Sequence, residues 1–365
     1  MNTLTLEKHC WAEIDLTALR ENYEYIRRTV GGPVCAVVKA DAYGHGDNVI
    51  ARVLQEAGAA GFAVSSLGEG RHLRRGGITT PILILGYADP TYAAVLAAND
   101  LITTCYSTEY AQALSAAAVK AGVKVKVHLK IDTGMGRYGF LPSQVAEAIA
   151  CYDLPNLEFT GAYTHFSSAF HDKAKTIAQL EVFKDTLAQI EKAGKTVGIR
   201  HAANSPALLN VEHVALDAVR IGSAFTGRVI THSKTPLHRL GRLEAEVVDI
   251  KEVPAGYAVG YNGTFVTKHP TTIAIVPMGH YDGFGLTKEK ENHNFHSVLS
   301  ALKQFLKKAH LTVTINGKAY PVIGEVGLSH TAVDVTGSSV QPGDIATCDL
   351  SPLLVNPRVP RVYTE

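Results

Sequence analysis

Residues 35–46 read C-A-V-V-K-A-D-A-Y-G-H-G, a stretch that joins a strand-like run to a reactive side chain. The apolar residues 35–38 are typical of a buried strand. Lys39 follows them directly, so the pattern places an ammonium group at the end of a hydrophobic strand. An amine held against apolar walls has a lowered pKa and is suited to form a Schiff base with an aldehyde. A single lysine in such a place is more often a surface charge, so its role depends on what the other strands carry.

Apolar runs of the same kind recur through roughly the first 225 residues and alternate with segments rich in Ala, Leu, Glu and Lys. Eight runs are present, at residues 35–39, 61–65, 81–85, 101–106, 125–131, 158–164, 198–202 and 217–221. Because strand-like and helix-like segments alternate, the sequence predicts an α/β fold of the (β/α)₈ TIM-barrel type. An open, doubly wound sheet shares this alternation but usually has fewer strands, so the barrel is favoured.

The pattern changes after about residue 235, where longer alternating segments at 243–253 and 271–278 are separated by turn sequences. This change predicts a second, mostly β C-terminal domain. We expect the barrel to cover residues 12–235 and the β-rich domain to comprise residues 236–365 with residues 1–11. Residues 297–309 carry apolar side chains at helical spacing, which predicts a helix inserted in the second domain.

The composition favours a small-molecule partner. The 35 Lys and Arg residues are balanced by 34 Asp and Glu residues, which leaves a formal net charge of +1 and no electrostatic footprint for nucleic acid or a membrane. The five cysteines are widely spaced without a C-x-x-C pair, as is typical of reduced thiols in a cytoplasmic protein. Neither a signal-peptide pattern nor a membrane-length apolar run is present.

Further polar residues follow other predicted strands. His165 closes the sixth run, Asn204 and Ser205 follow the seventh, and Arg220 lies late in the eighth. Chemistry in a (β/α)₈ barrel takes place at the carboxyl ends of the strands, so these groups are expected to meet near Lys39. One histidine alone is more often a satisfied structural residue, but four strands that end in polar groups favour a site.

A lysine that forms a Schiff base predicts pyridoxal phosphate as the cofactor. Ser205 and the backbone amides of Gly222 and Ser223 are candidates to bind the phosphate, with the Tyr43 hydroxyl beside them. Arg220 is the candidate partner of the pyridine nitrogen. A guanidinium does not readily lose its proton, so the ring nitrogen would stay unprotonated and the cofactor would be a weaker electron sink.

Three other motifs are set aside. Residues 134–139 match G-x-G-x-x-G, but Pro142 falls where the dinucleotide-binding helix would already be running. Residues 132–134 read D-T-G as in an aspartic protease, but they lie in an α/β chain. His293 and His296 lie in a polar segment with no further ligand close by, so we expect no metal site.

The chain resembles the bacterial alanine racemases. The motifs that carry the resemblance follow in that family's order: V-V-K-A-D-A-Y-G-H-G, K-I-D-T-G-M-G-R-Y-G-F, T-H-F, H-A-A-N-S-P-A and V-R-I-G. The resemblance covers nearly the whole chain and is most specific through residue 230. It implies an isomerase that interconverts L- and D-alanine with pyridoxal phosphate, in a head-to-tail homodimer with shared active sites.

The resemblance also implies roles by matching position. Lys39 would carry the Schiff base and act as one base, and Tyr261 in V-G-Y-N-G would be the opposing base from the other subunit. His165 would hydrogen-bond both Tyr261 and Arg220. Racemisation requires proton removal on one face of the Cα and return on the other, so two bases on opposite sides suit the reaction.

The remaining matches concern the substrate and the second domain. Arg137 would orient the substrate carboxylate, and Lys130 would be carbamylated to hold Arg137. Leu328 would border the substrate and Asn356 the cofactor phosphate. Residues 325–330 read E-V-G-L-S-H where the family usually has R-V-x-M-D-Q, and Asn356 replaces a tyrosine.

These differences leave alternatives open. A racemase that prefers serine or another small amino acid is the main one, because Asn356 offers space and a hydrogen-bonding group. A decarboxylase on the related barrel is less favoured, because Arg220 stands where an acidic residue would be typical. A non-catalytic cofactor-binding protein usually consists of the barrel alone, so the second domain with Tyr261 argues against it.

Overall fold

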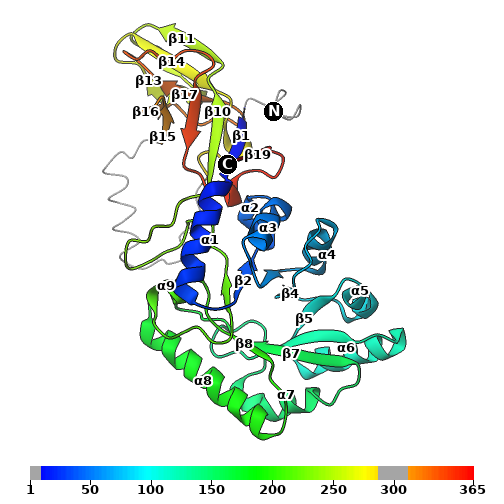
Figure 1. Cartoon of the computed structure of the whole chain (residues 1–365). Coiled ribbons are helices and arrows are strands. Elements are labelled where there is room, and N and C mark those ends of the chain that lie inside the picture. The colour runs from blue at the N-terminus through cyan, green and yellow to red at the C-terminus, as the bar shows by residue number, and fades with distance from the viewer. Residues whose placement is uncertain (1–9, 287–310) are drawn as a thin grey trace. The chain divides into compact units, whose positions relative to one another are not determined.

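The computed structural model of the chain describes residues 10–286 and 311–365 (Figure 1). It divides into two compact units, a barrel unit of residues 16–240 and a β unit of residues 10–15 with 241–364. The helix expected at residues 297–309 lies outside the described residues.

The boundaries of the units differ from those expected from the sequence. Residues 12–15 were placed in the barrel, but Ala12 pairs with Leu243 in the sheet of the β unit. Residues 236–240 were placed in the second domain, but they belong to the barrel unit. The strand partner of a residue far along the chain decides such a boundary, and local periodicity does not reveal it.

The barrel unit contains the predicted ring of eight parallel strands. Their order is β8-β7-β6-β5-β4-β3-β2-β9. A parallel bridge between His201 and Ala218 joins the two ends of this order, so the fold is the predicted (β/α)₈ barrel. Each predicted run overlaps one strand: β2 (Val34–Val37), β3 (Gly61–Val64), β4 (Ile82–Ile84), β5 (Leu101–Cys105), β6 (Val125–Lys130), β7 (Leu157–Tyr163), β8 (Ile199–His201) and β9 (Val219–Ile221).

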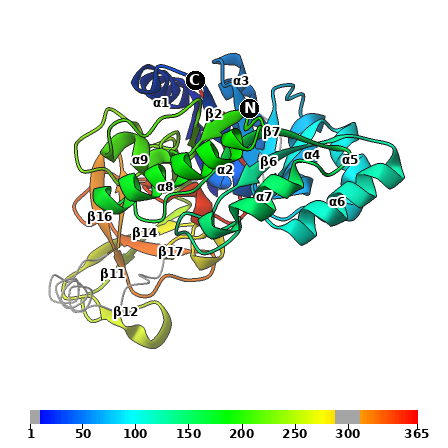
Figure 2. The ribbon, with the colours of Figure 1, turned by 90° about the horizontal axis from the view of Figure 1, so that it is seen from below.

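Helices follow the strands, and some of them begin at polar capping residues. Ser66 accepts a hydrogen bond from the Glu69 amide at the start of α4, and Ser107 does the same for Tyr110 at the start of α6. Figure 2 shows α6, α7 and α8 on the outside of the strands. The helices are α1 (Leu16–Val30), α2 (Lys39–Gly44), α3 (Asp47–Glu56), α4 (Leu67–Arg75), α5 (Ala93–Ala98), α6 (Thr108–Ala121), α7 (Val145–Cys151), α8 (Lys173–Lys192) and α9 (Ser205–Asn210). Of the helices in the described residues, none is long and apolar enough to cross a membrane.

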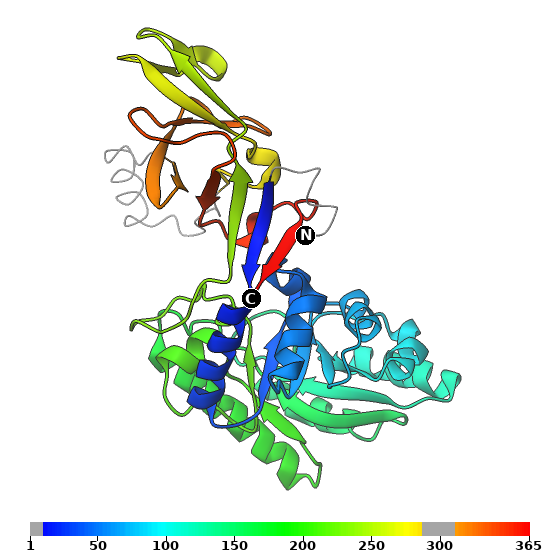
Figure 3. The ribbon, with the colours of Figure 1, turned by 45° about the horizontal axis from the view of Figure 1, so that its top comes forward.

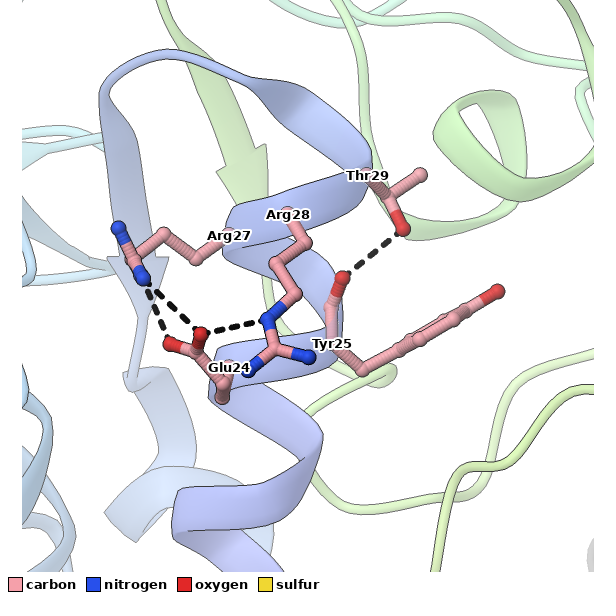
Figure 4. Close-up of polar contacts among 5 residues, drawn as sticks. All are labelled: Glu24, Tyr25, Arg27, Arg28 and Thr29. Carbon is pink, nitrogen blue, oxygen red and sulfur yellow. Dashed lines mark hydrogen bonds and ion pairs between the residues drawn. The ribbon is translucent and has the colours of Figure 1, made fainter.

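Helix α1 shows how the helices divide between core and solvent. Its residues Leu19, Tyr23 and Ile26 are buried. On its exposed side Glu24 accepts hydrogen bonds from Arg27 at 2.8 Å and from Arg28 at 2.7 Å (Figure 4). Surface ion pairs of this kind contribute little to stability, so the buried face accounts for the docking of α1.

The β unit is built on one nine-stranded sheet with the order β11-β14-β17-β16-β15-β18-β10-β1-β19. Figure 3 shows β1 between β10 and β19, which joins the two ends of the chain in one sheet. The mostly β second domain is therefore confirmed. Its strands are β1 (Cys10–Asp15), β10 (Gly241–Glu246), β11 (Asp249–Val253), β14 (Thr271–Val276), β15 (Thr312–Ile315), β16 (Lys318–Ile323), β17 (Thr331–Asp334), β18 (Ile345–Cys348) and β19 (Arg361–Thr364), and β12 (Ala258–Val259) and β13 (Phe265–Val266) form a separate pair.

Candidate active site

Lys39 lies at the first residue of α2, directly after β2, and is half buried. The four residues that follow it, from Ala40 to Tyr43, have φ between 50° and 57°. None of them is glycine, and the left-handed conformation costs an L-residue roughly 1–2 kcal/mol. Such a turn persists only where its surroundings hold it, and backbone strain of this kind is common at active sites.

Glu69 on α4 holds the turn after Lys39. Its Oε1 accepts a hydrogen bond from the Ala40 amide at 2.7 Å, and its Oε2 accepts one from the Ser65 amide at 2.6 Å. Within the turn, Asp41 Oδ1 accepts from the Asp47 amide at 2.9 Å. Glu69 is a further site residue that the strand-end pattern does not identify, although S-x-x-E at residues 66–69 is the pattern of a helix-capping box and is a signal for it.

The Lys39 amine lies in a positively charged environment. Burial lowers its pKa, the nearby charge of Arg137 lowers it further, and Glu69 opposes them. The amine therefore loses its proton at a lower pH than an ordinary lysine. An unprotonated amine is the form that attacks an aldehyde and the form that accepts a proton.

Asp132 positions the loop that carries Arg137. Its two carboxylate oxygens accept hydrogen bonds from the amides of Gly134, Met135, Gly136 and Arg137, at 2.7–3.1 Å. Burial alone would raise the pKa of Asp132, but the amide donors outweigh it and hold the pKa below its usual value. The D-T-G sequence at 132–134 is therefore a loop anchor, and Gly134 and Gly136 adopt the positive φ that the loop needs.

Lys130 is a buried ammonium group at the end of β6. Its Nζ lies 5.5 Å from the ring centroid of Tyr138 and 5.4 Å from that of Tyr163. Burial lowers its pKa to about 8, and the charges of Arg137 and Arg220 act in the same direction. The described residues offer this amine no hydrogen-bond acceptor, so it is chemically suited to react with carbon dioxide.

A group of hydrogen-bond donors surrounds Gly222. A Cβ on Gly222 would lie 2.2 Å from the Tyr43 hydroxyl, so only glycine allows this approach. The buried Ser205 Oγ accepts from the amides of Gly222 at 3.0 Å and Ala224 at 3.2 Å. An oxygen that accepts twice has its own proton left to donate, and the described residues supply no acceptor for it.

The donors expected from the sequence to bind the phosphate are therefore present except for one, the Gly222 amide. The Gly222 amide is already engaged by Ser205, so it is a positioning group. The hydroxyls of Tyr43 and Ser205 and the amide and hydroxyl of Ser223 have no acceptor among the described residues. Burial raises the pKa of Tyr43 to about 12, which keeps its phenol protonated as a donor. These free donors at one turn fit an anionic group such as a phosphate.

Arg220 is buried under the ring of Tyr163, with 4.9 Å between its Cζ and the ring centroid. Its Nη1 donates to His201 Nδ1 and to the His201 carbonyl, each at 2.8 Å. Its Nη2 donates to the Thr164 carbonyl at 2.6 Å and to the Ala202 carbonyl at 3.2 Å. The Nε–H has no acceptor in the described part of the chain, so a ring nitrogen would complete the donor set.

His165 is a weaker neighbour of Arg220 than the sequence implied. Its Nδ1 lies 3.5 Å from Arg220 Nη2, at the limit of a hydrogen bond. Burial, followed by the charges of Arg220, Arg137 and other cations, lowers the pKa of His165 to about 3. The imidazole is therefore neutral. Because its Nδ1 faces a guanidinium, its proton lies on Nε2.

Asn204 differs from the other candidates because its amide is already in use. Its Oδ1 accepts from the Ala207 amide at 3.1 Å and caps α9. Its Nδ2 donates to the Phe166 carbonyl at 3.4 Å. Asn204 therefore positions the Ser205 turn, and a direct contact to a cofactor does not follow from this geometry.

The candidates of the β unit are exposed. Tyr261 is 71% exposed and Leu328 is 72% exposed. Both border a hollow of about 550 Å³ in the β unit, together with Ser329 and His330. The segment at 325–330 is fixed by backbone bonds from His280 to the Gly327 carbonyl and from Tyr281 to the Leu328 carbonyl. Large apolar groups exposed side by side are typical of a surface that another surface covers.

Asn356 does not offer the free amide that the sequence suggested. Its Nδ2 donates to the Tyr281 carbonyl at 2.9 Å, and its Oδ1 accepts from the Arg358 amide at 3.0 Å. Both groups hold the local loop. Among the described residues, no cluster of three or more His, Cys, Asp or Glu side chains could hold a metal ion. His293 and His296 lie outside the described residues.

The fold and site together define a class of protein, a (β/α)₈-barrel enzyme with a half-buried lysine of lowered pKa beside free hydrogen-bond donors at the carboxyl ends of its strands. Comparison with known families gives the same class. Residues 14–229 match "Alanine racemase, N-terminal domain" and residues 240–350 match "Alanine racemase, C-terminal domain". The chain belongs to the alanine racemase family, whose members are pyridoxal-phosphate-dependent isomerases.

Individual relatives are similar over nearly their whole length. An alanine racemase of Desulfovibrio desulfuricans is 35% identical over 390 residues, covering 99% of this chain and 100% of that protein. One from Desulfosudis oleivorans is 36% identical and covers 90% of this chain and 83% of that protein. The solved alanine racemase of Clostridium difficile 630 is 30% identical, with a TM-score of 0.87 over 98% of this chain and 96% of that one.

Proposed function

We propose that the chain interconverts L- and D-alanine with pyridoxal phosphate. The observation that carries the proposal is the half-buried Lys39, whose pKa is lowered and whose turn is fixed by Glu69 next to the free donors around Gly222. The named relatives, which are alanine racemases, support alanine as the substrate.

The residues present fit the cofactor. Lys39 Nζ would anchor its aldehyde carbon, the donors of Tyr43, Ser205 and Ser223 would bind the phosphate, and Arg220 Nε–H would face the ring nitrogen. When bound, pyridoxal phosphate withdraws electrons from the Cα of the amino acid and makes its proton more acidic. Arg220 keeps its own proton, so it limits that withdrawal and disfavours side reactions that need a protonated ring.

Two bases then move the Cα proton. Lys39 Nζ takes or returns the proton on one face, and the Tyr261 oxygen does so on the other. To accept a proton, this oxygen requires a hydrogen-bond donor that stabilises its phenolate form. The neutral His165, with its proton on Nε2, is the candidate donor to that oxygen.

Arg137 is the candidate partner of the substrate carboxylate. The Asp132 carboxylate accepts a hydrogen bond from the Arg137 amide, so the loop that carries the guanidinium is fixed at that residue. Carbamylation of Lys130 would replace a buried cation by an anion among Arg137 and Arg220. That exchange relieves the repulsion that lowers the pKa of Lys130. Mass measurement of the native protein, with and without bicarbonate, tests the modification.

A head-to-tail homodimer would complete the site. The exposure of Tyr261 and Leu328 on the β unit supports this arrangement, because a partner subunit would cover both. Tyr261 would then serve the Lys39 of the other subunit.

Serine is a weaker second candidate. A hydrogen bond from Asn356 to a serine hydroxyl would compete with the Tyr281 carbonyl and the Arg358 amide, which already hold the Asn356 amide. The contribution of Leu328 and Ser329 to substrate choice stays a hypothesis.

The function is tested by incubating the purified, cofactor-loaded protein with single-enantiomer amino acids and following racemisation by chiral chromatography. We expect alanine to have the highest kcat/KM in both directions. A higher kcat/KM for serine would replace the proposed substrate, and no racemisation of any amino acid would overturn the proposed reaction.

A further inference from the structure

A second cavity lies at the end of the barrel unit opposite Lys39. The strands are parallel, so their first residues share one end of the barrel and Lys39, after β2, belongs to the other. The cavity has a volume of about 440 Å³. Small-molecule sites usually have volumes of about 300–1,000 Å³, so this one has room for a ligand.

The walls of this cavity are mainly apolar and include small residues. Cys35, Leu83 and Ile102 line it from three strands, and Gly61 leaves space because it has no side chain. A Cβ at Gly61 would lie 3.0 Å from the Pro81 carbonyl oxygen, so the wall is formed by tightly packed backbone at that point. An apolar body is therefore suited to the middle of the cavity.

Charged residues at the mouth of the cavity largely neutralise one another. Lys126 pairs with Asp100 at 2.7 Å, and Asp217 pairs with Arg200 at 2.9 Å. Glu158 adds a further carboxylate to the lining. The mouth therefore carries a small negative excess, which disfavours an anionic ligand.

A chain of histidines borders the deep end. Arg220 can only donate, so His201 Nδ1 accepts and the proton of His201 lies on Nε2. That proton is donated to His128 Nδ1 at 2.9 Å, which leaves the proton of His128 on Nε2. The described residues contain no acceptor for His128 Nε2–H. The Thr160 hydroxyl, also in the lining, is buried without a partner among them.

We propose that this cavity is a binding site for a small neutral molecule with an apolar body and one hydrogen-bond acceptor, which His128 Nε2–H binds. The acceptor end faces the positive Arg220 chain, and the apolar body fills the middle of the cavity. The same ligand polarises the chain of hydrogen bonds from His128 through His201 to Arg220. The site is separate from the one proposed for racemisation and does not depend on that function.

Two probes of nearly equal shape test the proposal, acetophenone and α-methylstyrene. The ketone accepts a hydrogen bond and the alkene does not. Saturation-transfer NMR titrations of the full-length, cofactor-loaded protein give both affinities. We expect acetophenone to bind roughly 2- to 12-fold more tightly, the range that corresponds to one hydrogen bond of about 0.5–1.5 kcal/mol.

Three variants locate the binding. Ala60→Trp adds a ring at an exposed position of the cavity lining and should weaken both probes at least fivefold, by roughly 1 kcal/mol or more. Ala94→Trp changes an exposed alanine on α5 that does not line the cavity, so it should leave both affinities unchanged. His128→Phe removes both ring nitrogens and should abolish the preference for acetophenone.

Each other outcome contradicts the proposal. Equal affinities of the two probes in the unmodified protein overturn the acceptor contact. No saturable binding, or equal binding by the Ala60→Trp and Ala94→Trp proteins, overturns the site. If His128→Phe does not fold, the two tryptophan variants and the comparison of the two probes still test the proposed site.

Discussion

The candidate residues of the barrel unit and those of the β unit are held in opposite ways. In the barrel unit, Lys39 follows a strained turn that Glu69 fixes, and Arg220 is buried with both terminal nitrogens bonded. In the β unit, Tyr261 and Leu328 are 71% and 72% exposed. One set is therefore preorganised within its own unit, and we expect the other to require a covering surface.

The two sets of residues therefore differ in how far they depend on assembly. Donors and an amine that the fold already holds in place bind a cofactor without rearrangement. Electrostatic catalysis requires preorganised groups of this kind. An exposed tyrosine has water around its hydroxyl and no fixed substrate beside it. We therefore expect cofactor binding to depend on the barrel unit alone and proton transfer to depend on both units.

The largest effect is expected for Lys39→Ala, which removes both the covalent anchor and one base. Racemisation of alanine should fall by at least about 10⁴-fold, the upper range for loss of one acid–base group. The visible absorbance of the bound cofactor should disappear on dialysis. Lys124→Ala, at an exposed lysine before β6, is the control and should retain both. A dialysis-resistant absorbance in the Lys39→Ala protein, discharged by borohydride onto another lysine, would contradict the assignment.

A smaller effect is expected for Tyr261→Phe, which keeps the ring and removes the hydroxyl. Racemisation should fall roughly 10²–10⁴-fold. Exchange of the Cα proton with solvent deuterium should persist for one alanine enantiomer and be lost for the other, because Lys39 still serves its own face. Tyr257→Phe, at another exposed tyrosine of the β unit, should exchange both enantiomers normally. Equal exchange of both enantiomers by the Tyr261→Phe protein would exclude the role.

Much of the barrel could be predicted from the sequence, because eight short apolar runs alternate with helical segments and each overlaps a strand. The left-handed turn at 40–43 could not, because Ala and Tyr rarely adopt positive φ and one Asp does not predict four such residues in a row. Its support by Glu69 is a contact between distant residues. The boundary at residue 12 was wrong for the same reason, since the pairing of Ala12 with Leu243 is non-local.

Side chains that bond to backbone were the hardest part of the site to predict. Sequence identifies an amide such as Asn356, but it does not say whether a carbonyl such as that of Tyr281 already occupies it. His128 and His201 lie inside strands, where a satisfied core histidine is the usual interpretation. Their hydrogen bonds to each other and to Arg220 form because three strands place these side chains at the same level of the barrel.

The buried histidines predict a pH dependence of stability in the barrel unit. Burial, with the charge of Arg220, lowers the pKa of His128 to about 4, and the pKa of His201 also lies well below its ordinary value. The unfolded chain binds these protons near pH 6.5 and the folded chain does not, so stability is lost as the pH falls from about 6.5 toward 4.

Each such histidine contributes a slope of up to about 1.4 kcal/mol per pH unit in that window. His128→Gln removes one of them, so the decrease of Tm between pH 7 and pH 5 should be shallower than in the unmodified protein. His171→Gln, at an exposed histidine, should follow the unmodified protein. Parallel Tm curves for all three proteins would show that His128 is not held neutral.

The smallest effect is expected at Asn356 in the β unit. Asn356→Ala removes two hydrogen bonds to backbone and should lower the free energy of unfolding by roughly 1–3 kcal/mol. The ratio of kcat/KM for serine over alanine should change less than about twofold, since both ends of its amide are held by backbone groups of the β unit. A large change in that ratio without loss of stability would show that Asn356 contributes to substrate binding.

We expect the barrel unit of one chain to work with the β unit of another, and subunit mixing distinguishes this arrangement from a site within one chain. Differently tagged Lys39→Ala and Tyr261→Phe chains are mixed under conditions of subunit exchange, and mixed dimers are recovered through both tags. Each mixed dimer then has one site with an intact lysine and tyrosine. Random pairing makes half of the dimers mixed, and each mixed dimer has one working site of two. The mixture before recovery should therefore have roughly one quarter of the unmodified activity. Doubly tagged dimers no more active than either parent would contradict the shared site.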